Sequence, residues 1–248
     1  GMPEALTKAL EQRFLETGSP KNLTLYYAAA QGNRDGSGAD HFAHEGMLKR
    51  VIGGHYNMVP ALGKLITDNK LEAYNLPQGT LSQLYRDIAA HKLGTLTHVG
   101  MNTFADPRIE GGKLNDVTTE DIVEVVEVLG EERLLYKAQK FDIGFIRGSY
   151  ADENGNVTLE HECCTTEATS IAQAVKNCGG KVVVQVEKVV QDGCVDPKLV
   201  KIPGIYVDAI VICENKEDHA QCQGCEYDGS MTGDFRVPLG SLSYPPMS

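Results

Sequence analysis

The sequence predicts an α/β protein in which a largely parallel, twisted sheet carries helices on both faces. Short apolar segments typical of strands alternate with segments of helical periodicity, which is the pattern of proteins with a parallel sheet. Residues 181–190 and 205–213 are rich in valine and isoleucine, as expected for strands buried on both faces. The chain also shows no internal repeat and no long linker that would divide the pattern.

The first element is a helix over residues 3–16, with Leu6, Leu10, Phe14 and Leu15 expected on one side. Residues 22–29 then form an apolar strand that leads into a glycine-rich loop. The elements expected next are helices near 42–51 and 60–69, a strand near 71–75, a helix near 80–91 and a strand near 95–99.

In the second half, residues 118–137 combine a helical opening with a strand over 133–138. The turn Asp152-Glu153-Asn154-Gly155-Asn156 predicts a hairpin, because Asn-Gly favours the positive φ angles of tight turns. Its strands are residues 142–149 and 157–160. A helix over 166–178, closed by a glycine pair, and the strands over 181–190 and 205–213 complete the sheet.

Composition indicates a globular domain rather than a nucleic-acid or membrane protein. The net charge of −11 disfavours binding to nucleic acid and to anionic membrane surfaces, so neither is an expected partner. No apolar run reaches the roughly 20 residues of a membrane span. The seven cysteines have no disulfide-like spacing, which favours a cytoplasmic location. We expect one α/β domain over 1–215 and a polar, Gly- and Pro-rich segment over 216–248, either a tail or the lead-in to another domain.

The cysteines allow two weaker functional hypotheses, a zinc site and a thiol nucleophile. Cys222 and Cys225, with Cys213 and His219 nearby, resemble one half of a zinc site, but no second C-x2-C pair exists, and we predict no metal site. The Cys163-Cys164 pair precedes a helix, where a thiol nucleophile is one reading and ordinary half-buried thiols are the more common one.

The segment over residues 73–80 is the strongest functional signal. A short strand ends at Asn75, Pro77 fixes a turn, and Gln78 and Gly79 precede a helix. This arrangement directs backbone N–H groups and the Gln78 amide toward one point, as a site for a carboxylate or an oxyanion requires.

From about Pro3 to Asp234 the chain resembles the N-terminal, alpha half of family I coenzyme A transferases, closest to the propionate/acetate type. The resemblance rests on ordered motifs: Gln31-Gly32-Asn33-Arg34-Asp35-Gly36, His44-Glu45-Gly46, Gly53-Gly54-His55, Tyr74-Asn75, Pro77-Gln78-Gly79, Thr103-Phe104, Asp106-Pro107-Arg108, Gly111-Gly112-Lys113, Phe145-Ile146-Arg147-Gly148 and Pro203-Gly204. It implies an active site at the junction of two α/β halves.

The resemblance implies ping-pong transfer of CoA between a short-chain acyl-CoA and a carboxylate, through a glutamyl-CoA thioester. The nucleophilic glutamate is expected on a complementary beta half outside this chain, so no catalytic residue is assigned here. Glu153-Asn154-Gly155 looks similar to the nucleophile motif, but the hairpin turn explains it better. The resemblance implies CoA and acyl-CoA as substrates, no permanently bound cofactor, and a homo- or hetero-oligomer.

Matching the motifs residue by residue identifies eleven substrate-binding candidates: Gln31, Gly32, Asn33, Arg34, His55, Tyr74, Asn75, Gln78, Gly79, Thr103 and Phe104. Structural roles remain open for several of them. Gln78 suits a turn, Tyr74 and Asn75 suit packing, and Phe104 suits the core. Arg34 pairing with Asp35 would only shape the loop, and His55 suits a structural role.

Two other function classes stay open. A sugar-phosphate isomerase or sugar-sensing module of the same fold superfamily would need a phosphate cradle, and the glycine-rich loop offers only Arg34. A non-catalytic ligand-binding or regulatory subunit would explain the missing nucleophile.

Overall fold

The computed structural model describes residues 1–29, 31–221 and 227–241. Its first half contains, in order, α1 (Glu4–Thr17), β1 (Leu23–Tyr27), η1 (Gly38–Phe42), β2 (Leu48–Gly53), α2 (Pro60–Thr67), β3 (Glu72–Asn75), α3 (Gln78–Ala89), β4 (Gly94–Thr97), β5 (Val123–Val128) and β6 (Glu131–Lys137). The second half contains β7 (Ile143–Arg147), β8 (Tyr150–Asp152), β9 (Val157–Thr158), α4 (Ala168–Asn177), β10 (Lys181–Val186), β11 (Lys188–Val190), β12 (Val200–Ile202), η2 (Gly204–Tyr206), β13 (Ala209–Ile212), η3 (Lys216–His219), α5 (Gly229–Thr232) and η4 (Leu239–Ser241).

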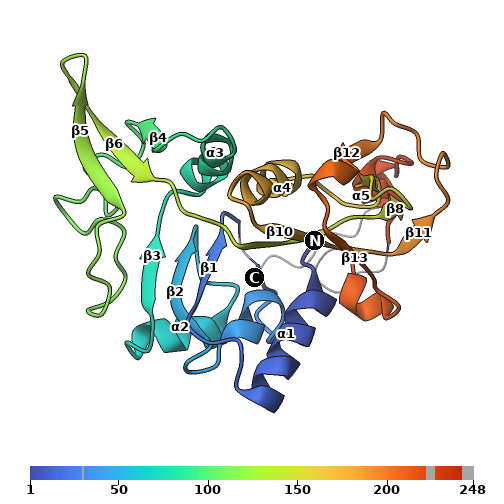
Figure 1. The fold of residues 1–248 in the computed structure, drawn as a ribbon, viewed down its shortest axis with the longest axis horizontal. Helices are drawn as coiled ribbons and strands as arrows, with labels where there is room; N and C mark the ends of the chain where they lie inside the picture. Colours follow the sequence, from blue (N-terminus) through green and yellow to red (C-terminus); the bar gives the residue numbers. More distant parts are fainter. Residues whose placement is uncertain (30, 222–226, 242–248) are drawn as a thin grey trace.

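The predicted α/β class is confirmed, and the described strands form four sheets. The first parallel sheet has the order β1-β2-β3, and the second parallel sheet has the order β13-β10-β7. A mixed sheet, β11-β8-β9-β12, and an antiparallel sheet, β4-β6-β5, complete the fold. Figure 1 shows α1 and α2 on one side of the strands and α3 and α4 on the other, as the sequence predicts.

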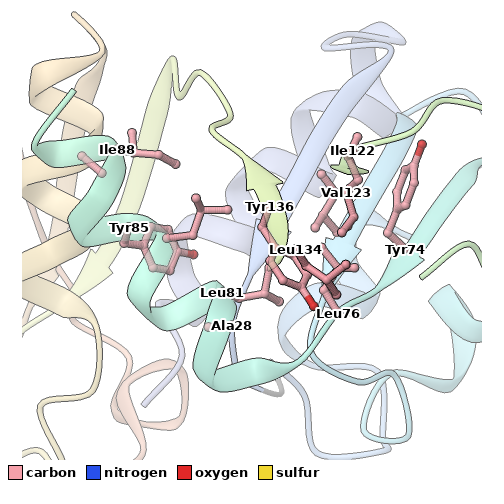
Figure 2. Packing of buried hydrophobic residues seen from close by; sticks show 13 residues of the cluster. Ala28, Tyr74, Leu76, Leu81, Tyr85, Ile88, Ile122, Val123, Leu134 and Tyr136 are labelled. Carbon is pink, nitrogen blue, oxygen red and sulfur yellow. The ribbon is translucent and has the colours of Figure 1, made fainter. Parts of the chain in front are cut away.

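The two faces of the first parallel sheet bury alternate side chains. Ile52 of β2 and Tyr74 of β3 are neighbours in register and pack on α3, whereas Val51 and Ala73 face the cluster that contains α2. The helix predicted near 80–91 is confirmed as α3, and four apolar residues at helical spacing are buried in this core (Figure 2): Leu81, Leu84, Tyr85 and Ile88. Burial of each such side chain stabilises the fold by about 1.5–3 kcal/mol.

Four predicted elements are wrong. The hairpin around residues 152–156 pairs β8 with β9, whereas β7, expected to be one of its strands, pairs in parallel with β10. Residues 48–53 form β2 instead of the helix expected near 42–51, because Val51 and Ile52 are buried on opposite faces of a sheet. The helical opening expected after residue 118 is strand β5, which pairs with β6 in a hairpin. The buried strand expected over 205–213 is a 3-10 turn followed by the short edge strand β13, in which Ile212 is 52% exposed.

A charged clamp fixes α1 to η1. Nε2 of the buried His41 lies 2.6 Å from Oε1 of Glu4, and its Nδ1 lies 2.5 Å from Oε2 of Glu11. The other oxygen of Glu11 lies 2.6 Å from Nε2 of His44. Burial lowers the pKa of His41, but hydrogen bonds and charges from the two glutamates outweigh burial and raise it above 6.5. His41 is therefore held as an imidazolium.

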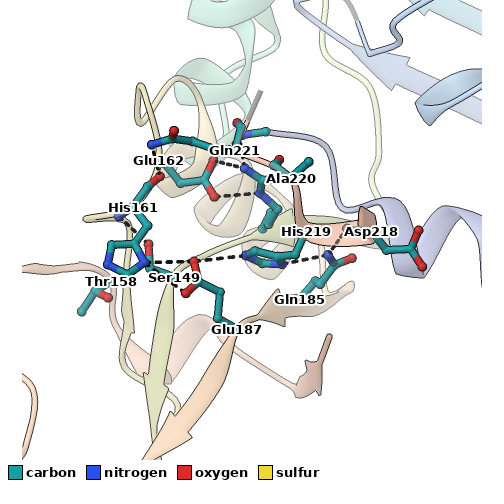
Figure 3. Close-up of polar contacts among 12 residues, drawn as sticks. Ser149, Thr158, His161, Glu162, Gln185, Glu187, Asp218, His219, Ala220 and Gln221 are labelled. Carbon is teal, nitrogen blue, oxygen red and sulfur yellow. Dashed lines mark hydrogen bonds and ion pairs between the residues drawn. The ribbon is translucent and has the colours of Figure 1, made fainter. Parts of the chain in front are cut away.

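A second polar cluster lies beside the second parallel sheet (Figure 3). The guanidinium of Arg147 donates from Nε and Nη2 to both carboxylate oxygens of Glu162, at 2.7 and 2.8 Å, and both side chains are buried. Arg147 also donates to the carbonyl oxygens of Ala220 and Gln221. The cluster thereby fixes the segment after η3 to the end of β7.

Candidate functional site

The candidate site lies at the carboxyl ends of β1, β2 and β3. These three strands are parallel, so the segments that follow them meet at one edge of the sheet. Ligands of open α/β sheets bind at such an edge. Most of the candidate residues follow these strand ends: Gln31, Gly32, Asn33 and Arg34 after β1, His55 after β2, and Gln78 and Gly79 after β3.

Gln78 and Gly79 are the first residues of α3, and both are exposed. A Cβ atom added to Gly54 would lie 3.1 Å from Cβ of Gln78 and 2.2 Å from the carbonyl oxygen of Ala28. The three strand ends are therefore in contact, and only a glycine fits between them. The first N–H groups of a helix have no partner within it, so this point combines free amide donors with the Gln78 side chain.

Asn75 joins this site to a second loop. Its N–H donates to the carbonyl oxygen of Gly112 at 2.7 Å, and the N–H of Gly112 donates to Phe104 at 2.8 Å. Gly112 has φ 74, and a Cβ there would lie 2.8 Å from the carbonyl oxygen of Asn75. The Thr103-Phe104 loop is thus held against the end of β3. Phe104 is 43% exposed, so its assignment to the core is excluded.

Tyr74 packs in the core instead of facing the candidate site. The residue is fully buried, and its hydroxyl donates to the carbonyl oxygen of Glu120 at 2.8 Å. The guanidinium carbon of Arg50 lies 5.7 Å from the ring centroid. Burial raises the pKa of Tyr74 to about 12, so the hydroxyl stays protonated. The expectation that the Tyr74 side chain lines a substrate pocket is corrected to a packing role.

The loop after β1 is held by the segment after β2. The N–H of Arg34 donates to the carbonyl oxygen of Met58 at 3.0 Å, and Arg34 has the uncommon φ of 74°. In the described ranges no ion pair joins Arg34 to Asp35. Asp35 instead accepts a hydrogen bond from Ser37, and its N–H donates to Asn33. The Arg34 residue is exposed and adds a positive charge to this loop.

Two tyrosines that the sequence did not predict as functional support the site through hydrogen bonds to its backbone. The hydroxyl of Tyr27 donates to the carbonyl oxygen of His55 at 3.2 Å, and that of Tyr56 donates to Tyr74 at 2.6 Å. Burial raises the pKa of both tyrosines, so both remain donors near neutral pH. Tyr56 directly follows His55 in the sequence, but this adjacency does not show which atom its hydroxyl reaches, and Tyr27 has no such neighbour.

Asp106 organises the Thr103-Phe104 loop. Its buried carboxylate accepts from the N–H of Asn102 at 2.9 Å and from Nη2 of Arg108 at 2.8 Å. These interactions with Arg108, opposed by burial, hold the pKa of Asp106 well below its usual range. Asn102 has φ 59, a left-handed conformation that asparagine tolerates better than most residues. The loop is therefore rigidly supported beneath its exposed residues.

The remaining candidates among the described residues have no site-like geometry. Glu153 lies in the β8–β9 hairpin, where Gly155 has φ 83, so the turn interpretation is confirmed. Cys222 and Cys225 lie outside the described residues. Among the residues that are described, no group of three His, Cys, Asp or Glu side chains is arranged to hold a metal ion. No helix in the same part of the chain is both long and apolar enough to cross a bilayer.

Comparison with known proteins gives the family. Residues 1–212 match the profile of the coenzyme A transferase family. The chain is 42% identical over its whole length to caffeate CoA-transferase of Acetobacterium woodii, covering 47% of that protein. It is 41% identical over 240 residues to acetate CoA-transferase YdiF of Escherichia coli K12, covering 96% of this chain and 45% of YdiF. The chain therefore spans about half the length of these relatives.

Solved structures agree with this assignment. The YdiF acyl-CoA transferase apoenzyme of Escherichia coli O157:H7 superposes with a TM-score of 0.90 at 39% identity, covering 96% of this chain and 46% of that one. A thioester complex of YdiF with CoA gives a TM-score of 0.89 at 40% identity, covering 94% and 47%. Together with the profile match over most of the chain, these similarities show that the chain belongs to the coenzyme A transferase family.

Proposed function

We propose that this chain is the alpha half of an enzyme that transfers CoA between a short-chain acyl-CoA and a carboxylate. The observation that carries the proposal is the contact of the three strand ends, which places the exposed Gln78 amide and the first N–H groups of α3 at one point. The named activities of its relatives, on caffeate and acetate, belong to the same class.

The reaction proposed has two half-reactions. A glutamate carboxylate of the complementary half attacks the thioester carbonyl, and CoA thiolate leaves to give a mixed anhydride. The thiolate then attacks the glutamyl carbonyl, which releases the first carboxylate and forms a glutamyl-CoA thioester. The second carboxylate takes over the glutamyl-bound CoA by the reverse sequence. Each step exchanges one acyl–oxygen or acyl–sulfur bond for another and needs no external oxidant or metal.

This chain would contribute donors and walls to that reaction. The Gln78 side chain and the Gly79 N–H would stabilise the oxyanion of each tetrahedral intermediate. Asn75 and the Thr103-Phe104 loop would enclose the acyl group, and Arg34 would attract the incoming carboxylate. Because the relatives are about twice as long, we place the glutamate and the rest of the site on the complementary half, joined to or associated with residues 216–248. We propose a cytoplasmic oligomer.

The test is to produce the chain together with a complementary half and to measure CoA transfer from acetyl-CoA to propionate, butyrate and caffeate, with release of acetate. We expect Gln78→Ala to lower kcat by about 100-fold, as when one oxyanion donor is lost. Gln83→Ala is the matched control, because Gln83 is an exposed glutamine on the same helix. We expect the control to keep full activity.

Mass spectrometry distinguishes the catalytic proposal from a binding or regulatory role. Incubation with acyl-CoA should add one CoA to the complementary half and none to this chain, and Glu153→Gln should not change that result. Full activity of Gln78→Ala would remove the role of Gln78. Absence of exchange and of any adduct in the folded assembly would favour the non-catalytic alternative.

A further inference from the structure

Glu4, the first residue of α1, reaches the base of the loop that carries Gln31 and Arg34. Its Oε2 accepts a hydrogen bond from the N–H of Gly38 at 2.9 Å, and its Oε1 lies 2.6 Å from Nε2 of His41. Glu4 is 7% exposed, and Gly38 and His41 are buried as well. One buried carboxylate therefore contacts the charged clamp on one side and the end of the 31–38 loop on the other.

The two ends of the 31–38 loop meet at Gly38. The N–H of Ala39 donates to the carbonyl oxygen of Gln31 at 2.7 Å. Gly38 has φ 68, and a Cβ atom added there would lie 2.3 Å from the same carbonyl oxygen. A side chain at this position would push the two backbone segments apart. The hydrogen bond from Gly38 to Glu4 therefore also determines the position of Gln31, one of the proposed substrate residues.

The tip of the loop has a separate support. The N–H of Arg34 donates to the carbonyl oxygen of Met58 at 3.0 Å, whereas residues 34–36 are exposed. A single hydrogen bond fixes one point of a loop and leaves its orientation free. Binding groups need supports that hold them to within about 0.5 Å. The base at Gly38 and the bond at the tip together determine where the Arg34 side chain can lie.

The carboxylate of Glu4 is itself held in place. The imidazolium of His41 fixes one of its oxygens, and the other oxygen thereby faces Gly38. An ionised acceptor forms a shorter and stronger hydrogen bond with an N–H group than a neutral acceptor does. Without Glu4 the buried N–H of Gly38 would lose its acceptor, which costs more than the bond itself contributes. The base of the loop would then shift toward another acceptor or toward water.

We infer that Glu4 is a positioning residue for CoA transfer, which orients the 31–38 loop toward the carboxylate substrate. It acts through Gly38 on Gln31 and Arg34. The inference rests on the proposed function, because it takes this loop to bind the carboxylate. Loss of Glu4 should therefore weaken binding of the carboxylate and leave the chemical steps, which the Gln78 amide serves, nearly unchanged.

The test is the steady-state kinetics of the chain assembled with a complementary half, with acetyl-CoA as donor and propionate as acceptor. Glu4→Ala should raise KM for propionate by about 10-fold and change kcat by less than about twofold, since an interaction used only for binding affects KM. Glu4→Gln should restore KM, because its amide oxygen still accepts from Gly38 and its NH2 group donates to a neutral His41. This rescue should occur although Glu4→Gln removes the ion pair.

Glu11→Ala is the matched control, because Glu11 belongs to the same helix and lies 2.5 Å from the other ring nitrogen of His41. Among the described residues the Glu11 carboxylate bonds to His41 and His44 and to none of the 31–38 loop. The control should lower Tm and leave KM for propionate unchanged. An equal rise of KM in Glu11→Ala, or a Glu4→Gln variant as impaired as Glu4→Ala, would overturn the inference.

A second variant keeps the inference falsifiable if Glu4→Ala does not fold. Gly38→Ala displaces the base of the loop but retains the contact of Glu4 with His41, and it should raise KM for propionate in the same way. Wild-type transfer with unchanged KM in Glu4→Ala, or in Gly38→Ala in its place, would overturn only the role of Glu4. Absence of CoA transfer by the wild-type assembly would overturn the proposed function and this role with it.

Discussion

Replacing His41 with glutamine should destabilise the protein most strongly at mildly acidic pH. His41 is 8% exposed and lies between two carboxylates, one at each ring nitrogen. A neutral imidazole has only one N–H, so both contacts with Glu4 and Glu11 are satisfied only by the imidazolium. Glutamine has a similar polarity but carries no charge, and it leaves a buried glutamate without its cation.

The expected loss in the free energy of unfolding is about 3 kcal/mol at pH 6. Each hydrogen bond to a charged group contributes about 1.5–3 kcal/mol, and removing one partner of a buried ion pair costs about 3–5 kcal/mol. We take the lower part of that range, because the Glu11 side chain is 25% exposed. For a protein of this size the loss corresponds to a Tm lower by about 6–12 °C.

The destabilisation caused by His41→Gln should decrease as the pH rises. The folded-state pKa of His41 is raised above 6.5, so the stability that its charge contributes is fully present below pH 6.5. This contribution is lost as the pH rises through the folded-state pKa. Urea unfolding followed by far-UV circular dichroism suits a chain without tryptophan, and it should show the gap between wild type and His41→Gln narrowing from pH 6 to pH 9.

His98→Gln is the matched control, because His98 is exposed. It should unfold like the wild type at every pH. A gap for His41→Gln that stays constant between pH 6 and pH 9 would refute the imidazolium clamp and would indicate a packing effect instead.

Three other substitutions test the supports of the fold and the site. Gly112→Ala should destabilise the chain by about 1–3 kcal/mol, because φ is positive and the methyl group would lie 2.8 Å from the carbonyl oxygen of Asn75. The same change should lower CoA transfer by the assembled enzyme, and Tm and activity are the measurements. Asp106→Asn should lower the free energy of unfolding by about 2 kcal/mol and speed hydrogen exchange over residues 99–112, because Arg108 loses its ionised partner. The difference in the free energy of unfolding between variant and wild type should vanish as the pH falls below the lowered pKa of Asp106. Arg147→Met should cost about 3–5 kcal/mol in urea unfolding, because Glu162 stays buried without its counter-ion; an unchanged midpoint would contradict that role.

Helices were predictable where one apolar stripe had a clear period. In α3 the spacing of Leu81, Leu84, Tyr85 and Ile88 matches a single helical face, and all four are buried. Around β2, the pairs Met47-Leu48 and Val51-Ile52 have the same spacing as a helical stripe, although Met47 precedes the strand, and Val51 and Ile52 are buried on opposite faces of it. Periodicity alone does not separate these cases. Isoleucine and valine beside Gly53-Gly54 were the signals for a strand.

The β5–β6 hairpin was missed for a different reason. Its two-residue turn is Leu129-Gly130, with φ angles of 55° and 80°. Both values are those of a type I′ turn, which asparagine or aspartate usually begins. Leucine at the first position gives no turn signal, so the sequence did not indicate that the valines of β5 form a strand paired with β6.

The position of the candidate site was predictable only in part. The strands before Gln31 and Gln78 were predicted, and parallel strands end at a common edge, but β2, which brings Gly54 between them, was expected to be a helix. The supporting roles of Tyr27 and Tyr56 were not predictable, because a tyrosine in an apolar segment resembles an ordinary core residue. Only the structure shows that the hydroxyl of Tyr27 reaches a carbonyl oxygen 28 residues away and that of Tyr56 one 18 residues away.

The separation of the two parallel sheets has a consequence for how the protein unfolds. The first sheet is built from residues 23–75 and the second from 143–212, so each is a contiguous stretch of the chain. Contiguous stretches of this kind form cooperative units that open one at a time. The seam between them includes the bonds from Ser82 to Glu167 and from Asn177 to Ala89, which link α3 to α4 or the residue preceding it. Loosening that seam would uncouple the two units, so that each melts at its own temperature.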